Sequence, residues 1–204
     1  MPASDMGTEH FSAEAFVESA GAILFRVSAG QICILHHLAH DHYVLPKGRR
    51  HCGEGRHEAA IRELAEETGH QCRLLPVNMT TRAPPASSGA SEPDEVRPAT
   101  NICEPFYLQI RHPRESEVKV IWWYIAVEVS SRDQRLVKQS EKDKERFTNE
   151  FHDYGRALDK LSFDSDRGVV KQAVAIVEET FRATAGEATE QDPKVVNVMR
   201  ERPV

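Results

Sequence analysis

Three acidic side chains, Glu63, Glu66 and Glu67, stand close together in a segment of good helix formers over residues 56–68. On a helix with about 100° between residues, Glu67 lies about 40° to one side of Glu63, and Glu66 lies about 60° to the other. The three carboxylates therefore share one helical face. Apolar residues such as Leu64 turn away from that face and can pack against a sheet.

Clustered carboxylates repel one another, so a cation or solvent has to balance their charge. Hard oxygen ligands on a rigid element suit Mg²⁺, which keeps several of its waters and pairs well with substrate phosphates. The competing interpretation is a solvated acidic helix face, which is a common feature of protein surfaces. The helix alone does not decide between these two interpretations.

The residues around the helix add a spaced pattern. Residues 48–70 read GRRHCGEGRHEAAIRELAEETGH, which resembles the Nudix signature of Gly, five residues, Glu, seven residues and then Arg-Glu-aliphatic-x-Glu-Glu-x-Gly-aliphatic. The matching positions are Gly48, Glu54, Arg62, Glu63, Leu64, Glu66, Glu67 and Gly69. His70 departs from the pattern, which has an aliphatic residue there. That position follows the helix, so the departure concerns packing rather than chemistry.

The resemblance implies an α/β fold, namely the Nudix-type α/β/α sandwich with a mixed β-sheet, and hydrolysis of a phosphoanhydride bond. It also implies that Glu63, Glu66 and Glu67 bind the metal or activate water. The cofactor would be Mg²⁺, with Mn²⁺ as the alternative ion. Glu54 would support the metal network, and the backbone carbonyl of Gly48 would also reach the metal.

Arg62 borders the acidic face. The resemblance implies that its guanidinium orients a glutamate by charge-assisted hydrogen bonding. Simple i,i+4 pairing with Glu58 and Glu66 is the alternative. The family often adds a further base or ligand from a later loop, and the sequence offers three candidates without choosing among them: Glu141, Glu145 and Glu150.

A basic, glycine-containing loop comes directly before the helix. Its basic side chains, which we interpret as a cradle for a polyphosphate, are Lys47, Arg49, Arg50 and His51. An exposed basic loop without a ligand is the alternative. A second basic rim would come from Arg82, Arg111, His112, Arg114 and Lys119. The histidines at positions 36, 37, 40 and 42 span a strand end and a loop, which argues against a zinc site there.

The LPKG run at residues 45–48 is similar to the Nudix branch that hydrolyses diadenosine polyphosphates and diphosphoinositol polyphosphates. We therefore expect a Mg²⁺-dependent pyrophosphohydrolase acting on one of these substrates. One alternative is a hydrolase of another nucleoside diphosphate derivative, such as ADP-ribose, a sugar nucleotide or an RNA cap. The other is a catalytically silent Nudix module that senses a metabolite or contacts a protein. The intact Glu63, Glu66 and Glu67 argue against a silent module.

Strand patterns at 19–27, 31–38, 43–45, 105–110 and 119–129 and helical patterns at 153–161 and 166–182 predict a layered α/β domain. In the strand over 119–129, one of Trp122 and Trp123 should point inward and the other outward. Residues 83–99 hold four prolines and are predicted to be a disordered insertion. Residues 132–146 are predicted to be an exposed loop. We expect a flexible leader over 1–17, one hydrolase domain over 18–183 and a tail over 184–204.

Composition narrows the function classes further. The 204 residues carry a formal net charge of −6, which argues against sequence-independent binding to nucleic acid. The four cysteines form no C-x-x-C pair and are typical of reduced thiols inside a cell. No signal peptide or membrane-spanning run is evident. We expect a cytoplasmic or nuclear protein with a small-molecule polyphosphate substrate and no membrane partner, and the oligomeric state stays undetermined.

Overall fold

A computed structural model describes residues 7–85, 93–129 and 146–191. The strands are β1 (Phe16–Arg26), β2 (Gln31–His37), β3 (His42–Val44), β4 (Lys47–Arg49), β5 (Cys72–Leu74), β6 (Val77–Thr81), β7 (Arg97–Ile102), β8 (Tyr107–Arg114), β9 (Glu117–Glu128) and β10 (Phe147–Asp153). The helices are α1 (Arg56–Thr68), α3 (Tyr154–Lys160) and α4 (Asp164–Gln191), and a 3-10 turn, η1 (Val27–Ala29), joins β1 to β2.

Eight of the described strands form one mixed sheet, with β10, β2, β1, β9 and β5 in that order. The two longest strands, β1 and β9, run parallel at its centre, and the other pairings are antiparallel. β3 adds to β2, β4 adds to β1 and β8 adds to β9. At the end of the sheet where β1 begins, the neighbouring strands are therefore β4, β1, β9 and β8.

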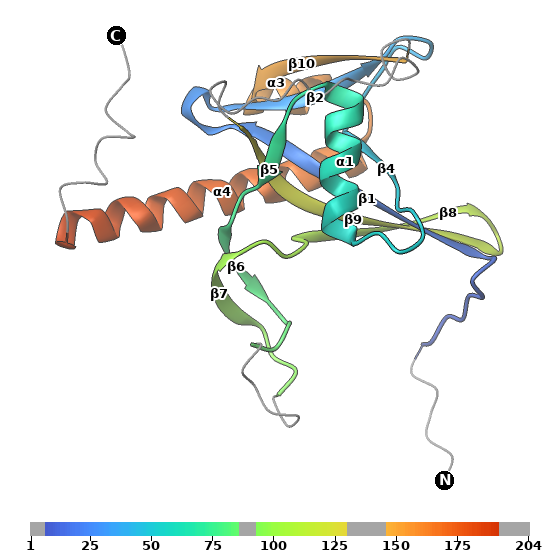
Figure 1. Cartoon of the computed structure of the whole chain (residues 1–204), viewed down its shortest axis with the longest axis horizontal. Helices are drawn as coiled ribbons and strands as arrows, with labels where there is room; N and C mark the ends of the chain where they lie inside the picture. The colour runs from blue at the N-terminus through green and yellow to red at the C-terminus, as the bar shows by residue number, and fades with distance from the viewer. Residues whose placement is uncertain (1–6, 86–92, 130–145, 192–204) are drawn as a thin grey trace.

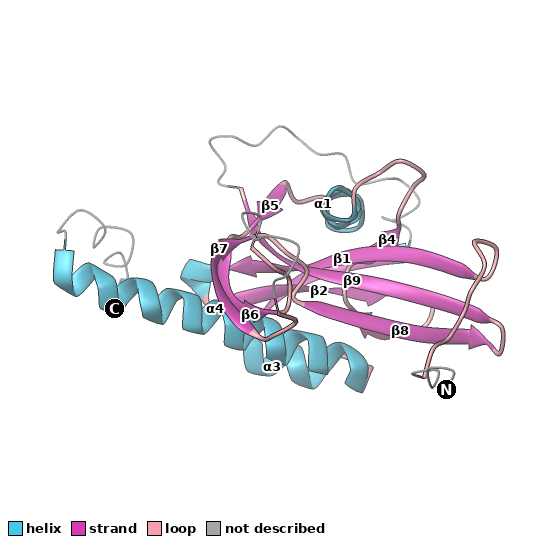
Figure 2. Cartoon of the chain, turned by 90° about the horizontal axis from the view of Figure 1, so that it is seen from below, coloured by secondary structure: helices cyan, strands magenta, loops and turns pink. Residues whose placement is uncertain are grey.

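The helices cover both faces of this sheet, with α1 on one side and α3 and α4 on the other (Figure 1 and Figure 2). The central strand β1 shows why, since seven consecutive residues, 19–25, are buried. Side chains alternate along a strand, so Ala22 and Leu24 pack under α1, whereas Ile23 and Phe25 join the core beneath α3 and α4. The predicted α/β/α sandwich with a mixed sheet is confirmed.

Some local predictions were wrong. Lys47–Arg49 form β4 rather than a loop, because the edge of β1 offers them hydrogen-bond partners. β10 was missed, although it pairs along the whole of β2. The predicted disordered insertion over 83–99 extends too far, since residues 97–99 pair with β6 in a separate two-stranded ribbon. In addition, β1 begins at Phe16 and α4 continues to Gln191, and the division into leader, domain and tail stays a prediction.

The two adjacent tryptophans of β9 divide between the two faces, as the strand pattern predicted. Trp123 is fully buried under α4, and Trp122 is half-buried on the α1 side. The predicted exposed loop over 132–146 falls almost wholly outside the described residues, as do residues 86–92 of the predicted insertion. No helix within the described ranges is long and apolar enough to span a bilayer.

Candidate active site

The helix α1 has the predicted bounds, and its two ends explain them. At its start the Gly55 amide donates to the Glu58 carboxylate at 2.8 Å, which satisfies a backbone group left open by the first turn. At its end Gly69 adopts a left-handed conformation with φ of 74°, which stops the helix. The residues buried against the sheet are Ala59, Ala60, Leu64 and Thr68. The three glutamates lie to the side of this buried stripe, where Glu63 and Glu67 face strand β4.

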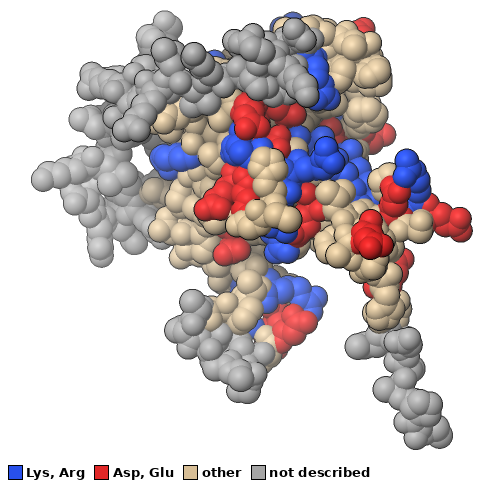
Figure 3. Space-filling model, turned by 45° about the vertical axis from the view of Figure 1, so that its right-hand side comes forward, with Lys and Arg blue, Asp and Glu red and all other residues tan. Residues whose placement is uncertain are grey.

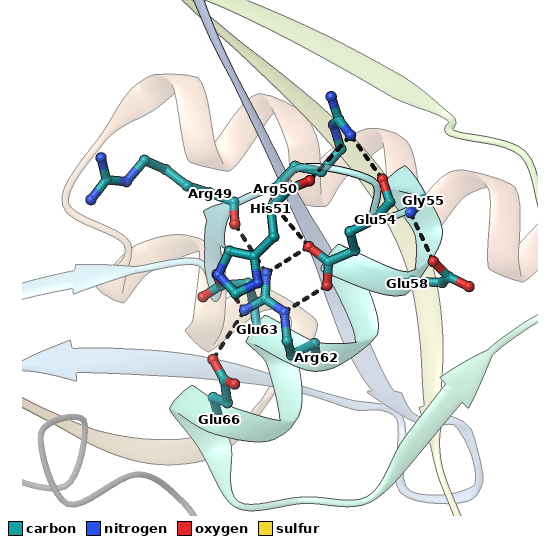
Figure 4. Close-up of polar contacts among 9 residues, drawn as sticks. All are labelled: Arg49, Arg50, His51, Glu54, Gly55, Glu58, Arg62, Glu63 and Glu66. Atoms are coloured by element: carbon teal, nitrogen blue, oxygen red, sulfur yellow. Dashed lines mark hydrogen bonds and ion pairs between the residues drawn. The ribbon is translucent and has the colours of Figure 1, made fainter.

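Arg62 is the centre of a hydrogen-bond network that ties this face to the loop before it (Figure 4). Its Nε and Nη2 donate to the two carboxylate oxygens of Glu54 at 2.6 and 3.0 Å. Its Nη1 donates to Glu63 at 2.8 Å and to Glu66 at 3.1 Å. Its Nη2 also donates to the Arg49 carbonyl at 3.0 Å. Arg62 thus fixes the positions of three carboxylates, and such bidentate, charge-assisted bonds are among the stronger ones in proteins.

This hydrogen-bond network shifts the pKa values of Glu54 and Arg62. Hydrogen bonds from Arg62 lower the pKa of Glu54 to about 2, and the pKa of Arg62 is raised in return, chiefly by Glu54. Both groups are therefore charged at neutral pH. The i,i+4 pairing of Glu58 with Arg62, offered as an alternative from the sequence, is absent from the described contacts, because Glu58 caps the helix instead.

Strand β4 brings backbone atoms against the acidic face. A Cβ atom at position 48 would overlap the Glu63 carboxyl group, so only glycine lets the two approach. One residue earlier, the Lys47 amide donates to Glu67 at 2.8 Å. The sequence match at Gly48 therefore has a steric reason.

Carboxylate oxygens from Glu63, Glu66 and Glu67 beside the backbone of Gly48 form a donor set that suits a hard divalent cation. The close fit of Glu63 against Gly48 supports this assignment, since it keeps a carboxylate and the β4 backbone in one small space. As the side chains lie in the described residues, no three acidic, histidine or cysteine side chains are placed to hold a metal ion together. Glu63 and Glu66 each direct an oxygen to Arg62, so ion binding requires these carboxylates to adjust.

The later acids do not complete the cluster in the part of the chain that the structure describes. Glu150 lies on β10 and accepts hydrogen bonds from Lys160 and His152, each at 2.7 Å. The bond from Lys160 lowers the pKa of Glu150, which is held as a surface ion pair near α3. The other two candidates, Glu141 and Glu145, lie outside the described residues.

The basic loop divides between the two faces of the sheet. Lys47 and Arg49 pair with Gly21 and Ser19 of β1, which places their side chains on the α4 side. Lys119 on β9 and Arg111 on β8 are cross-strand partners on the same side. Burial lowers the pKa of Lys119, and the charges of Lys47, Arg111 and Arg49 lower it further. We call these four residues the basic quartet.

Arg50 points to the opposite side, contrary to the predicted cradle. Its guanidinium donates to Glu18 at 2.9 Å and to the Glu54 carbonyl at 2.9 Å, so it supports the loop from behind. His51 contributes its amide, which donates to Glu54 at 2.9 Å, and its side chain is exposed. If residues 47–50 had been treated as a strand, the alternation of side chains would have placed Arg50 on the other face from Lys47 and Arg49.

Glu18 is a residue that supports the basic loop and that sequence reasoning missed. Its partial burial acts to raise its pKa, but hydrogen bonds from Arg56 and Trp122 and the charges of Arg56 and Arg50 together lower it. Arg56 also lies over the Trp122 ring, 4.2 Å from its centroid. The available signal was a lone carboxylate inside the otherwise apolar strand β1.

A pocket of about 440 Å³ lies beside Glu18, on the α1 side of the loop. It is lined by Glu18, Arg50, Glu54, Gly55, Arg56, His57 and Tyr124. This lining contains none of the three glutamates on the acidic face of α1. The pocket thus includes Glu54 of the Arg62 network but lies away from the acidic face of α1.

Other predicted residues lie away from the acidic face. In the second basic rim, only Arg111 and Lys119 join the quartet, whereas Arg82 pairs with Asp94 and Arg114 pairs with Glu117. His37 at the end of β2 and His40 in the following turn lie with their rings tilted against each other, 4.6 Å between the centroids. No metal-binding group involving these histidines exists among the described residues. Acidic and basic atoms interleave across the face seen in Figure 3.

Comparisons with known proteins find the same fold and a family model that covers the site. A family model described as NUDIX domain matches residues 15–166. The C. elegans Ap4A hydrolase in a binary complex superimposes with a TM-score of 0.51 at 17% identity, covering 78% of this chain and 96% of that one. A NUDIX hydrolase from Nitrosomonas europaea superimposes with a TM-score of 0.51 at 12% identity, covering 78% and 88% respectively. At these identities the likeness to both structures concerns the fold.

Proposed function

This chain belongs to the NUDIX domain family and is a hydrolase of phosphoanhydride bonds, and we propose that it is a Mg²⁺-dependent pyrophosphohydrolase of highly phosphorylated small molecules. Diphosphoinositol polyphosphates and diadenosine polyphosphates are the proposed substrates. Mn²⁺ is the alternative ion.

The observation that carries this proposal is the position of the basic quartet relative to the acidic face of α1. Lys47 and Arg49 lie on β4, whose backbone contacts Glu63 and Glu67. The Glu63 carboxylate is close enough to Lys119 to act on its pKa. The four cations lie on the α4 side of the sheet, next to the strand whose backbone meets the proposed metal ligands. They match a substrate with several phosphates, since each phosphate needs its own charge balance.

The chain's own residues divide the work of hydrolysis. Phosphoanhydride cleavage depends mainly on charge neutralisation and on a positioned water. Bound Mg²⁺ would lower the pKa of that water and offset charge on the phosphate oxygens. Glu63, Glu66 and Glu67 would hold the ion, Arg62 and Glu54 would keep these carboxylates in register, and the quartet would orient the phosphate chain. These roles match the contacts of Arg62 and of Lys47 described above.

A hydrolysis screen with Mg²⁺, in which the products of each substrate are separated by anion-exchange chromatography, tests the proposal. The substrates are a diphosphoinositol polyphosphate, a diadenosine polyphosphate and ADP-ribose, with the Glu63→Gln variant as the inactive control. We expect turnover of one of the first two to exceed that of ADP-ribose at least tenfold. A preference for ADP-ribose would instead favour a nucleoside diphosphate derivative, and absence of turnover on all three would favour a silent module.

A further inference from the structure

Asp166 is a buried carboxylate beneath the basic quartet, and the proposed catalytic chemistry does not use it. It lies in the first turn of α4 and is only 3% exposed. Its Oδ1 accepts a hydrogen bond from Nη2 of Arg111 at 3.2 Å and one from the Ser165 hydroxyl at 3.4 Å. A backbone hydrogen bond with Leu45, two residues before Lys47, also reaches it.

A second set of contacts fixes Arg111 and α4 in the same place. The side-chain oxygen Oε1 of Gln109 accepts from Nη2 of Arg111 at 3.3 Å and from the Trp123 indole at 3.0 Å. The side-chain nitrogen Nε2 of Gln109 donates to the backbone carbonyl of Ser165 at 3.2 Å. β8, β9 and the start of α4 are therefore linked at one point, and the position of Asp166 relative to Arg111 is well defined.

The charges around Asp166 identify it as an internal counter-ion. Burial raises its pKa, and the charges of Arg111 and Lys47 act in the opposite direction. These two cations belong to the quartet, and both also act on Lys119. Asp166 thus removes about one unit of positive charge from a site that presents four cations.

We propose that Asp166 is a specificity-determining residue, which limits the affinity of the basic quartet for the most highly charged phosphate chains. The inference rests on the proposed function, because it takes the quartet as the phosphate-binding surface. A fixed negative charge repels each phosphate charge, so its effect grows with the number of charges on the ligand. It therefore narrows the difference in affinity between short and long phosphate chains and favours release of a charged product.

Isothermal titration calorimetry without divalent metal, using inorganic pyrophosphate and tripolyphosphate as probes, tests this. The Asp166→Asn variant keeps the shape of the side chain and loses its charge. We expect its dissociation constant to fall about tenfold for tripolyphosphate and about threefold for pyrophosphate, and both effects should shrink at high salt. The matched control is Asp94→Asn, which breaks an arginine–aspartate pair on the remote β6–β7 ribbon and should leave both constants unchanged.

A second variant distinguishes the effect of the lost charge on phosphate affinity from an effect of the substitution on folding. Asp166→Asn combined with Arg111→Gln restores the net charge of the site, so the affinity ratio of the two probes should return to within about twofold of wild type. If Asp166→Asn changed the dissociation constants of both probes by the same factor, or weakened the binding of both, the inference would be overturned. The proposed function would still stand. Failure of wild type to bind either probe would reject the quartet as a phosphate site and the inference with it. The hydrolysis screen would still decide separately whether the proposed substrates are turned over.

Discussion

The substitution Gly48→Ala tests the geometry of the site with a single methyl group. The added Cβ would overlap the carboxyl group of Glu63, which cannot withdraw without breaking its bond to Arg62. A displacement of about 1 Å in a catalytic constellation commonly costs about 100-fold in rate. We therefore expect kcat to fall at least 100-fold.

The same substitution should cost little stability. Gly48 lies in β4 with an ordinary backbone conformation, so alanine is sterically allowed in the strand itself. Replacing glycine by alanine reduces the freedom of the unfolded chain by about 0.4–1 kcal/mol, and overpacking costs about 1–3 kcal/mol. The net destabilisation should be about 2 kcal/mol or less, which leaves the enzyme folded.

Steady-state kinetics at saturating Mg²⁺ give kcat for each variant, and a urea unfolding curve gives its free energy of unfolding. Gly155→Ala is the matched control, because its new Cβ would lie 3.5 Å from Asp153 in ordinary contact on the short helix α3. It should keep full activity. A Gly48→Ala enzyme with activity within threefold of wild type would refute the close packing of Glu63 on β4 as a requirement for catalysis.

Three further predictions follow from the same contacts. Glu67→Gln keeps an acceptor for the Lys47 amide and removes a charge from the acidic face, so we expect kcat to fall about 100-fold with a higher Mg²⁺ requirement; unchanged turnover would contradict a metal role. Lys47→Ala should raise the KM for the preferred polyphosphate about tenfold, whereas Arg50→Ala should mainly lower the melting temperature. The reverse pattern would contradict the placement of Lys47 and Arg50 on opposite faces of the sheet. Glu54→Gln removes a carboxylate whose pKa is about 2 in the folded protein, against an ordinary value of 4.5. Above pH 4.5 the unfolding free energy of wild type should therefore exceed that of the variant by about 1–3 kcal/mol. This difference should vanish as the pH falls through 2. Urea unfolding between pH 2 and 7 measures that difference, and a gap that persists at pH 2 would mean that it does not come from the Arg62 pair.

Local regularities made part of this site predictable. The bounds of α1 follow from its helix-forming residues and from Gly69, and the shared face of Glu63, Glu66 and Glu67 follows from helical periodicity alone. The role of Arg62 also agrees with its place in the signature, since it bonds to glutamates on both sides of it in sequence. These features depend on residues within about ten positions of each other.

Strand pairing decided what the sequence left open. Arg50 was grouped with Lys47 because the two are neighbours in the chain, yet β4 is a strand, and its side chains alternate between the α1 and α4 faces. β4 itself exists because the edge of β1 accepts it, and an isolated three-residue segment carries no such signal.

The sequence by itself determined the acidic helix, its glycine stop and the family to which the box belongs, because these are set by local spacing. Only the tertiary structure decided that Lys119, Arg111 and Asp166 lie beside Lys47, since they come from β9, β8 and α4. The physical reason is that a mixed sheet brings together residues more than 60 positions apart through hydrogen bonds between strands, and no local pattern encodes that pairing.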